Sequence, residues 1–302
     1  MVLIHGFGAS GRHWRHTLPA LAPDAAVVAV DLLGFGGSDK PPSCLSGEIP
    51  VTGSVRYSFD LWAEQVADLV LELSPVSAQA RRVHLVGNSI GAMVALTTAR
   101  LLRQRRRPPV QVILIDCAQR RLDDRRLAEQ LPTARLGRPL LKTMVRQRWL
   151  IAPLFALLAR PAFIRRVLLQ AYPSGANVDD ELVELLHGPS TTAGAAESFR
   201  GFVNLFRDHL APDLLRELSN PAEPDEAAIA VRMIWGEADP WEAVAEARHW
   251  AATFSCIQAL EVLPGVGHCP HDEAPQLVNP ILRNWIMGTS TSAGLGDEER
   301  ER

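Results

Sequence analysis

The chain has 302 residues, of which 47% are hydrophobic, and it carries a formal net charge of -3. This size suits one large domain or two small ones, and the near-neutral charge gives no indication of nucleic-acid binding. No apolar run reaches the ~18 residues of a membrane span, and we expect no signal peptide because no basic region precedes the apolar residues 2–4. The four cysteines show no Cys-x-x-Cys spacing, so we predict no metal, no redox pair and a reducing compartment.

Apolar strands alternate with helices in the first part of the chain. We predict strands at residues 2–5, 26–30 and 110–115 and another that starts at residue 83, with helices at about 14–21, 59–73 and 90–102. Alternation of this kind predicts crossover units and a parallel sheet. Because the first strand starts at residue 2, we also expect that one or two N-terminal strands of the sheet are missing.

The alternation breaks in the middle of the chain. Only helices are predicted from residue 118 to residue 220, whereas strands return at 231–235 and 259–263 and helices at 242–254 and 273–287. This pattern predicts an α/β core formed by residues 1–117 and 221–287, with residues 118–220 inserted between two core strands as a helical cap. Residues 288–302 are rich in Gly, Ser, Thr and charge, so we expect a disordered tail.

A sharp turn around Ser89 is the chemical centre of the sequence. Residues 87–91 read Gly-Asn-Ser-Ile-Gly, between a short apolar strand and an apolar helix. This Gly-x-Ser-x-Gly pattern is typical of a nucleophile elbow, which exposes a serine hydroxyl above the end of a sheet. Glycine is expected at both ends because a side chain there would collide with the neighbouring strand or helix. We therefore predict that Ser89 is a nucleophile, with an ordinary strand-to-helix turn as the alternative.

A nucleophilic serine needs a base and an acid that orients the base, and on such folds the order is serine, acid, histidine. The acid is expected after the strand that follows the insert, where we choose Asp239 over Glu237 and Glu242. A helix N-cap is the alternative role for this aspartate. The base is expected after the last strand, where His268 is preferred to His271 because His271 lies near the start of the closing helix.

The oxyanion formed during such a reaction needs two donors. One is expected to be the backbone N–H of Ile90, which follows the nucleophile, and the other the N–H of Phe7 in the glycine-rich turn after the first strand. Together these motifs predict the α/β-hydrolase fold, a mostly parallel sheet flanked by helices. They predict a carboxylic ester hydrolase that works through an acyl-enzyme and needs no cofactor.

The predicted cap is strongly apolar. Residues 149–158 read WLIAPLFALL, apolar on every side, whereas a cap helix has only one side that faces the core. The simplest interpretation is that these residues pack on the core. The alternatives are a hydrophobic substrate pocket, for which we select Trp149, Leu154 and Phe155, and contact with a membrane surface, which flanking arginines would suit.

The chain resembles the α/β-hydrolases related to plant pheophytinase and chlorophyll dephytylase, with their cyanobacterial relatives. The resemblance spans nearly the whole chain. It rests on HGFGAS at residues 5–10, DLLGFGGS at 31–38, YSF at 57–59, GNSIG at 87–91, VDDELV at 178–183, HGP at 187–189, WGEADPW at 235–241 and GHCPHDEAP at 267–275. One departure is Ala92, where many relatives have a second glycine.

The resemblance implies that Ser89, Asp239 and His268 form the catalytic triad and that Phe7 and Ile90 are the oxyanion donors. It implies a phytyl ester of a chlorophyll-type pigment as the substrate. We expect a cytoplasmic protein, and a peripheral contact with a (thylakoid) membrane is the further option. The sequence does not indicate an oligomeric state.

Two other functions stay open. One is a hydrolase of small esters, lactones or C–C bonds on the same fold, and the other is a binding protein that keeps the fold without catalysis. A nucleophilic aspartate is excluded because the elbow carries Ser89.

Overall fold

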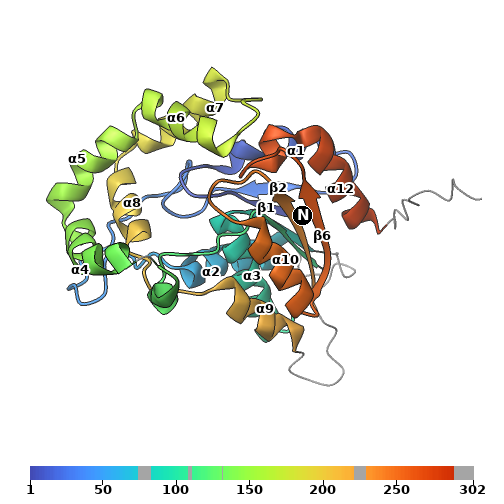
Figure 1. Ribbon diagram of the computed structural model, residues 1–302, viewed down its shortest axis with the longest axis horizontal. Helices are drawn as coiled ribbons and strands as arrows, with labels where there is room; N and C mark the ends of the chain where they lie inside the picture. Colours follow the sequence, from blue (N-terminus) through green and yellow to red (C-terminus); the bar gives the residue numbers. More distant parts are fainter. Residues whose placement is uncertain (74–82, 108–110, 131, 221–228, 289–302) are drawn as a thin grey trace, which may run out of the picture.

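A parallel sheet forms the centre of the computed structural model, which describes residues 1–302 except 74–82, 108–110, 131, 221–228 and 289–302 (Figure 1). Its six strands are all parallel and follow the order β2-β1-β3-β4-β5-β6. They are β1 (Val2–Ile4), β2 (Val28–Val30), β3 (His84–Asn88), β4 (Gln111–Ile115), β5 (Ala230–Gly236) and β6 (Ile257–Leu263). The predicted parallel sheet is therefore confirmed.

The helices follow the predicted alternation. They are η1 (Gly11–Trp14), α1 (Thr17–Leu21), α2 (Phe59–Leu73), α3 (Ile90–Gln104), η2 (Asp124–Glu129), α4 (Pro132–Arg146), α5 (Arg148–Leu158), α6 (Pro161–Ala171), α7 (Asp180–Ser190), α8 (Ala195–Val203), α9 (Ala211–Ser219), α10 (Val244–Thr253), α11 (Pro270–Glu273) and α12 (Pro275–Met287). The helix predicted at 273–287 is interrupted because Ala274 is not helical (φ -134, ψ 57) and Pro275 starts a new helix.

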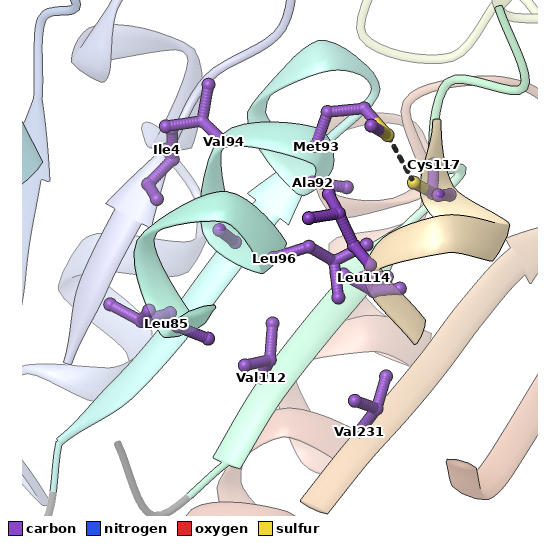
Figure 2. Close-up of a cluster of buried hydrophobic side chains, with 14 of the residues drawn as sticks. Ile4, Leu85, Ala92, Met93, Val94, Leu96, Val112, Leu114, Cys117 and Val231 are labelled. Carbon is purple, nitrogen blue, oxygen red and sulfur yellow. Dashed lines mark hydrogen bonds between the residues drawn. The ribbon is translucent and has the colours of Figure 1, made fainter. Parts of the chain in front are cut away.

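Both faces of the sheet are buried, as expected for parallel strands. On one face, alternate strand residues pack with α2, α3, α9 and α10, and Figure 2 shows Leu85, Val112, Leu114 and Val231 of three strands beneath α3. On the other face, the strand residues in between pack with α1 and α12. Leu3 of β1 is one of them, and its neighbours Val2 and Ile4 belong to the first face. The period of two in the strands thus supplies two separate cores.

β1 lies inside the described sheet. It pairs with β2 on one side and with β3 on the other, although β1 starts at the second residue. The strand order reverses between β1 and β3, because the chain runs outward to β2 and then crosses to β3. In open α/β sheets, ligands bind at the carboxyl ends of the strands at such a switch point.

In the described part of the insert between β4 and β5, every regular element is a helix (Figure 1). Its last helix, α9, packs on α3, and Leu214, Leu215 and Leu218 join the core beneath it. The predicted tail lies outside the described residues apart from Gly288. Within the described chain, no helix combines the length and the apolar character needed to cross a bilayer.

Candidate active site

The switch point between β1 and β3 carries Ser89. This residue follows β3 directly and has a left-handed backbone (φ 55, ψ -119) that only a few per cent of non-glycine residues adopt. The turn is held on both sides, since Ser89 N–H donates to Ile115 O at 2.9 Å and Ala118 N–H donates to Ser89 O at 3.2 Å. Backbone strain of this kind persists where the surroundings enforce it, and it is common at functional sites.

The two glycines of the elbow are required by close backbone contacts. A Cβ on Gly87 would lie 2.2 Å from the carbonyl oxygen of Gly91, and a Cβ on Gly91 would lie 2.3 Å from the carbonyl oxygen of Ile4 in β1. The collision expected from the sequence is therefore real at both positions. Gly6 is also close, because a Cβ there would lie 3.3 Å from the Cβ of Ser89.

The predicted base and acid are bonded to each other. His268 Nδ1 lies 2.7 Å from Asp239 Oδ2, and the side chain of Asp239 is buried. Burial alone would raise the pKa of Asp239, but the hydrogen bond and the charge of His268 outweigh it and lower the pKa below its ordinary value. Asp239 is thus ionised at neutral pH and fixes the orientation of the imidazole.

Asp239 does not take the alternative role of helix N-cap, because α10 begins at Val244 and its N-cap position is Ala243. Its side chain instead holds the turn that precedes this helix. Its Oδ1 accepts the backbone N–H groups of Trp241 at 2.8 Å and Glu242 at 3.1 Å, which leaves Oδ2 for His268. The two rival acids are engaged elsewhere: Glu237 forms a surface ion pair with Arg248, and Glu242 accepts the N–H of Gln119.

A second acid, Asp116, was not predicted. It follows β4 and is fully buried, and its carboxyl group lies within 4.8 Å of the reactive atoms of Asp239 and His268. Burial and then the charge of Asp239 raise the pKa of Asp116 well above its ordinary value. Because Oδ1 accepts the N–H of Gly236 at 3.0 Å, we assign the proton of this neutral acid to Oδ2.

The loop that carries His268 is tied to the core and to the cap. Asn88, beside Ser89, donates its amide to His268 O at 3.0 Å, and His268 N–H donates to Ala171 O at the end of α6 at 2.8 Å. Gly267 is required here, because a Cβ would lie 2.1 Å from Ala171 O. The cap and the predicted base therefore share a backbone hydrogen bond.

The two predicted oxyanion donors belong to two segments that meet at Ser89, the start of α3 and the turn after β1. Ile90 starts α3, so its N–H has no partner within the helix. Phe7 follows β1 in the turn that brings Gly6 against Ser89, and its ring stacks on Phe202 of α8 with centroids 4.0 Å apart. The helix N-terminus adds a partial positive charge at this point.

Ser89 and His268 line one cavity of about 670 Å³ between the sheet and the cap. The volume lies within the ~300–1,000 Å³ of small-molecule sites. Most of the wall is apolar and comes from the cap, through Leu141, Val145, Val167, Leu168, Leu186, Phe202, Leu205 and Phe206. The cavity is therefore suited to a hydrophobic ligand held beside the hydroxyl of Ser89.

The three pocket residues selected from the sequence are not part of this wall. Trp149 is 72% exposed and Leu154 is 42% exposed, while Phe155 packs on Phe199 with ring centroids 5.2 Å apart. The reason is the direction of α5, which turns most of its side chains outward. The cavity instead uses neighbouring cap helices, including Leu141 and Val145 of α4.

Two further histidines lie near the cavity. His13 is part of its wall, bonds the hydroxyl of Tyr172 at 2.8 Å, and has its pKa lowered to about 4 by burial. His271, the rival base, is fully buried between the rings of His13 and Trp14, and its two ring nitrogens have no hydrogen-bond partner among the described residues. His271 thus has a packing role, and neither histidine partners Asp239.

Asp116, Asp239 and His268 are the one group of such side chains, within the described ranges, whose ligand atoms are close enough to hold a metal. His268 Nδ1 is already paired with Asp239, and a neutral Asp116 is a poor ligand. We therefore interpret the cluster as an acid–base network. All four cysteines are free thiols.

Comparison with known proteins gives one family match and several distant relatives. The model described as "Alpha/beta hydrolase family" matches residues 1–281. The chloroplastic pheophytinase of Arabidopsis thaliana is 26% identical over 95% of this chain and 60% of its own length. A pimeloyl-[acyl-carrier protein] methyl ester esterase of Aeromonas hydrophila is 38% identical, over 32% of this chain and 30% of that protein. The chain thus spans less than two thirds of either relative.

Among solved structures, a thermophilic esterase from Thermogutta terrifontis has a TM-score of 0.66 and 22% identity, covering 95% of this chain and 89% of that one. At this identity the likeness concerns the fold. The predicted α/β-hydrolase fold is confirmed, while the particular resemblance to pheophytinase rests on a distant similarity.

Proposed function

The chain belongs to the alpha/beta hydrolase family, and from the arrangement around Ser89 we propose that it is a serine hydrolase that cleaves carboxylic esters through an acyl-enzyme. The observation that carries the proposal is the 2.7 Å bond between His268 and Asp239, with His268 and Ser89 on the wall of one cavity. A base oriented by a buried carboxylate beside a strained serine is the arrangement that nucleophilic acyl transfer needs.

The reaction has two halves. His268 Nε2 takes the proton of Ser89 as Oγ attacks the ester carbonyl carbon, and the resulting imidazolium is stabilised by ionised Asp239. His268 then returns the proton to the leaving alcohol as the ester C–O bond breaks, which leaves an acyl group on Ser89. Water then attacks the acyl carbon as His268 takes its proton. His268 returns this proton to Ser89 Oγ as the bond between Oγ and the acyl carbon breaks, which releases the acid and restores Ser89.

The backbone N–H groups of Phe7 and Ile90 are the donors proposed for the oxyanion. Ile90 follows Ser89 directly at the start of α3, and Phe7 follows Gly6, which lies against Ser89. The N-terminus of α3 adds its partial positive charge. Donors fixed by the backbone need no reorganisation as charge develops, and each is worth about 10²–10³ in kcat.

For the substrate we propose a hydrophobic ester, specifically a phytyl-type ester of a chlorophyll-like pigment. Two observations support this class. The cavity wall supplied by the cap is apolar, and the 26% identity with pheophytinase extends over 95% of the chain. A phytyl chain needs such a wall, because each buried methylene contributes about 0.8 kcal/mol.

The first test is whether Ser89 is a nucleophile. A fluorophosphonate probe should label the wild-type protein and fail to label Ser89→Ala, with circular dichroism as the check on folding. If the wild type is not labelled and hydrolyses no ester, the protein is a binding protein that keeps the fold, and the proposal is wrong.

The second test separates substrate classes. Chlorophyll a, pheophytin a and p-nitrophenyl butyrate are incubated with wild type and with Ser89→Ala, and products are separated by chromatography. Release of phytol by wild type alone supports the pigment ester. Rapid cleavage of the short ester with both pigments intact would instead favour a hydrolase of small esters.

A further inference from the structure

The outer side of the cap carries an apolar surface that the cavity does not use. We call helices α4, α5 and α6 (Pro132–Ala171) the cap arc, since Figure 1 shows them as an arc on the side of the cap away from the sheet. Apolar side chains that would normally be buried are exposed along this arc. Large exposed apolar patches on monomeric proteins mark interaction sites.

Helix α5 shows the pattern most clearly. Every residue after Arg148 is apolar, yet Ile151 is the only one whose side chain is buried. Trp149, Leu154 and Leu157 are exposed, with Trp149 at 72%. A helix that is apolar all round is normally buried in a core or in a membrane, and this helix has most of its surface in neither place.

Helix α4 continues the same surface. Leu136, Leu140 and Met144 recur every fourth residue and are all exposed, Leu136 to 85% and Leu140 to 66%. Residues with this spacing lie on one face of a helix. The adjoining positions Leu141 and Val145 line the cavity, so α4 separates the cavity from the outer apolar surface.

The arc is also strongly cationic. Residues 130–178 contain eight basic residues and no acidic residue, in a chain whose formal net charge is -3. Four of these cations pair with carboxylates outside the segment. Arg135, Arg146, Arg160 and Arg166 have no carboxylate partner among the described residues. Arg160, the N-cap of α6, and Arg166, in the middle of α6, are exposed.

We propose that the cap arc docks on the surface of an anionic phospholipid bilayer. The side chains of α5 enter the boundary between headgroups and acyl chains, and the arginines contact lipid phosphates. Charge decides between this occupant and a second copy of the chain, because a symmetric dimer through the arc would place the same cations against one another. The proposal does not depend on what Ser89 does.

The test is co-sedimentation with vesicles. The wild type should bind vesicles of phosphatidylcholine mixed with phosphatidylglycerol, bind pure phosphatidylcholine more weakly, and lose affinity as salt is added. Changing Arg160→Glu together with Arg166→Glu should weaken partitioning by at least roughly 25-fold, since each of the two cations contributes about fivefold. Trp149→Ala with Leu154→Ala should weaken it by about tenfold or more through lost apolar contact.

A charge-matched control is available outside the cap arc. Arg106→Glu with Arg216→Glu makes the same change in net charge on exposed residues at the end of α3 and on α9, away from the arc, and should leave binding at the wild-type level. The four arc residues lie outside the cavity wall, so cleavage of a water-soluble ester, or the circular dichroism spectrum, should not change.

Three outcomes would overturn the proposal. If the wild-type protein does not co-sediment with anionic vesicles, the proposal is refuted directly. Equal losses in the arc and control charge variants would show that net charge, not the arc, is responsible. A dimer in analytical ultracentrifugation that Trp149→Ala with Leu154→Ala converts to a monomer would assign the surface to a second copy.

Discussion

Replacing Asp239 by asparagine should remove most turnover by forcing His268 into the wrong tautomer. Asp239 Oδ1 accepts the N–H groups of Trp241 and Glu242, and Oδ2 faces His268 Nδ1 at 2.7 Å. An asparagine that keeps both backbone bonds must place its carbonyl oxygen at the Oδ1 position. Its NH₂ group then points at His268 Nδ1, which must accept instead of donate.

The proton of the imidazole therefore moves to Nε2, the atom that takes the proton of Ser89. An imidazole in this state cannot act as the base, and a tautomer fault of this kind lowers kcat by about 10⁴. Turning the amide over does not restore the wild-type state. The NH₂ group would then face the backbone N–H groups of Trp241 and Glu242. Each of these donors would lose its acceptor, which lowers the stability of the folded protein by about 1–3 kcal/mol per donor.

The assay is the initial rate of p-nitrophenyl butyrate hydrolysis by purified protein. The matched control is Asp116→Asn, in which an amide replaces a neutral acid: its oxygen still accepts the N–H of Gly236, and its NH₂ takes the position of the protonated Oδ2. This control should keep turnover near the wild-type level. Wild-type turnover in Asp239→Asn, or an equal loss in Asp116→Asn, would refute the assignment of the acid.

Three further predictions concern stability. Gly91→Ala should lower the free energy of unfolding by about 1–3 kcal/mol or more in urea titration, because its Cβ would overlap a carbonyl oxygen of β1. Gly137→Ala in α4, where a Cβ meets nothing within 4 Å, should instead be neutral or gain about 0.5–1 kcal/mol, and a loss there would undermine the comparison. Asp116→Ala should lower the free energy of unfolding by about 1–3 kcal/mol more than Asp116→Asn does, since alanine leaves the buried N–H of Gly236 without an acceptor. Burial raises the pKa of Glu242 from 4.5 to about 8, so its contribution to stability is full below pH 4.5 and is lost as the pH rises through about 8. Glu242→Gln should flatten this decline in Tm, and an unchanged pH profile would contradict the assignment.

Local patterns were sufficient to predict most of the core. The amphipathic period of residues 59–73 predicted α2 with its observed bounds, because one apolar face packs on the sheet whatever the rest of the chain does. The closing helix was placed correctly but its interruption was missed. Pro275 carried the signal, since the residue before a proline avoids the helical conformation.

The candidate site was predictable where chain order and spacing define it. Asp239 and His268 lie on different strand ends, and the order serine, acid, histidine selected both before their 2.7 Å contact was known. Asp116 was missed because a polar residue after an apolar strand is common, and only the sheet order brings the end of β4 beside the end of β5. The cap wall was missed for a related reason: an all-apolar helix such as α5 has no period to say which side faces inward.

The hydrogen bond from His268 N–H to Ala171 O couples the position of the cap to that of the predicted base. If the cap lifts away as a rigid body, this bond breaks and two backbone groups lose their partners, at about 1–3 kcal/mol for each one that stays buried. The loop that carries His268 then loses one of its anchors and keeps those from Asn88 to His268 O and from Gly267 N–H to Glu273. A form with the cap lifted would therefore also hold the imidazole of His268 less firmly beside Ser89.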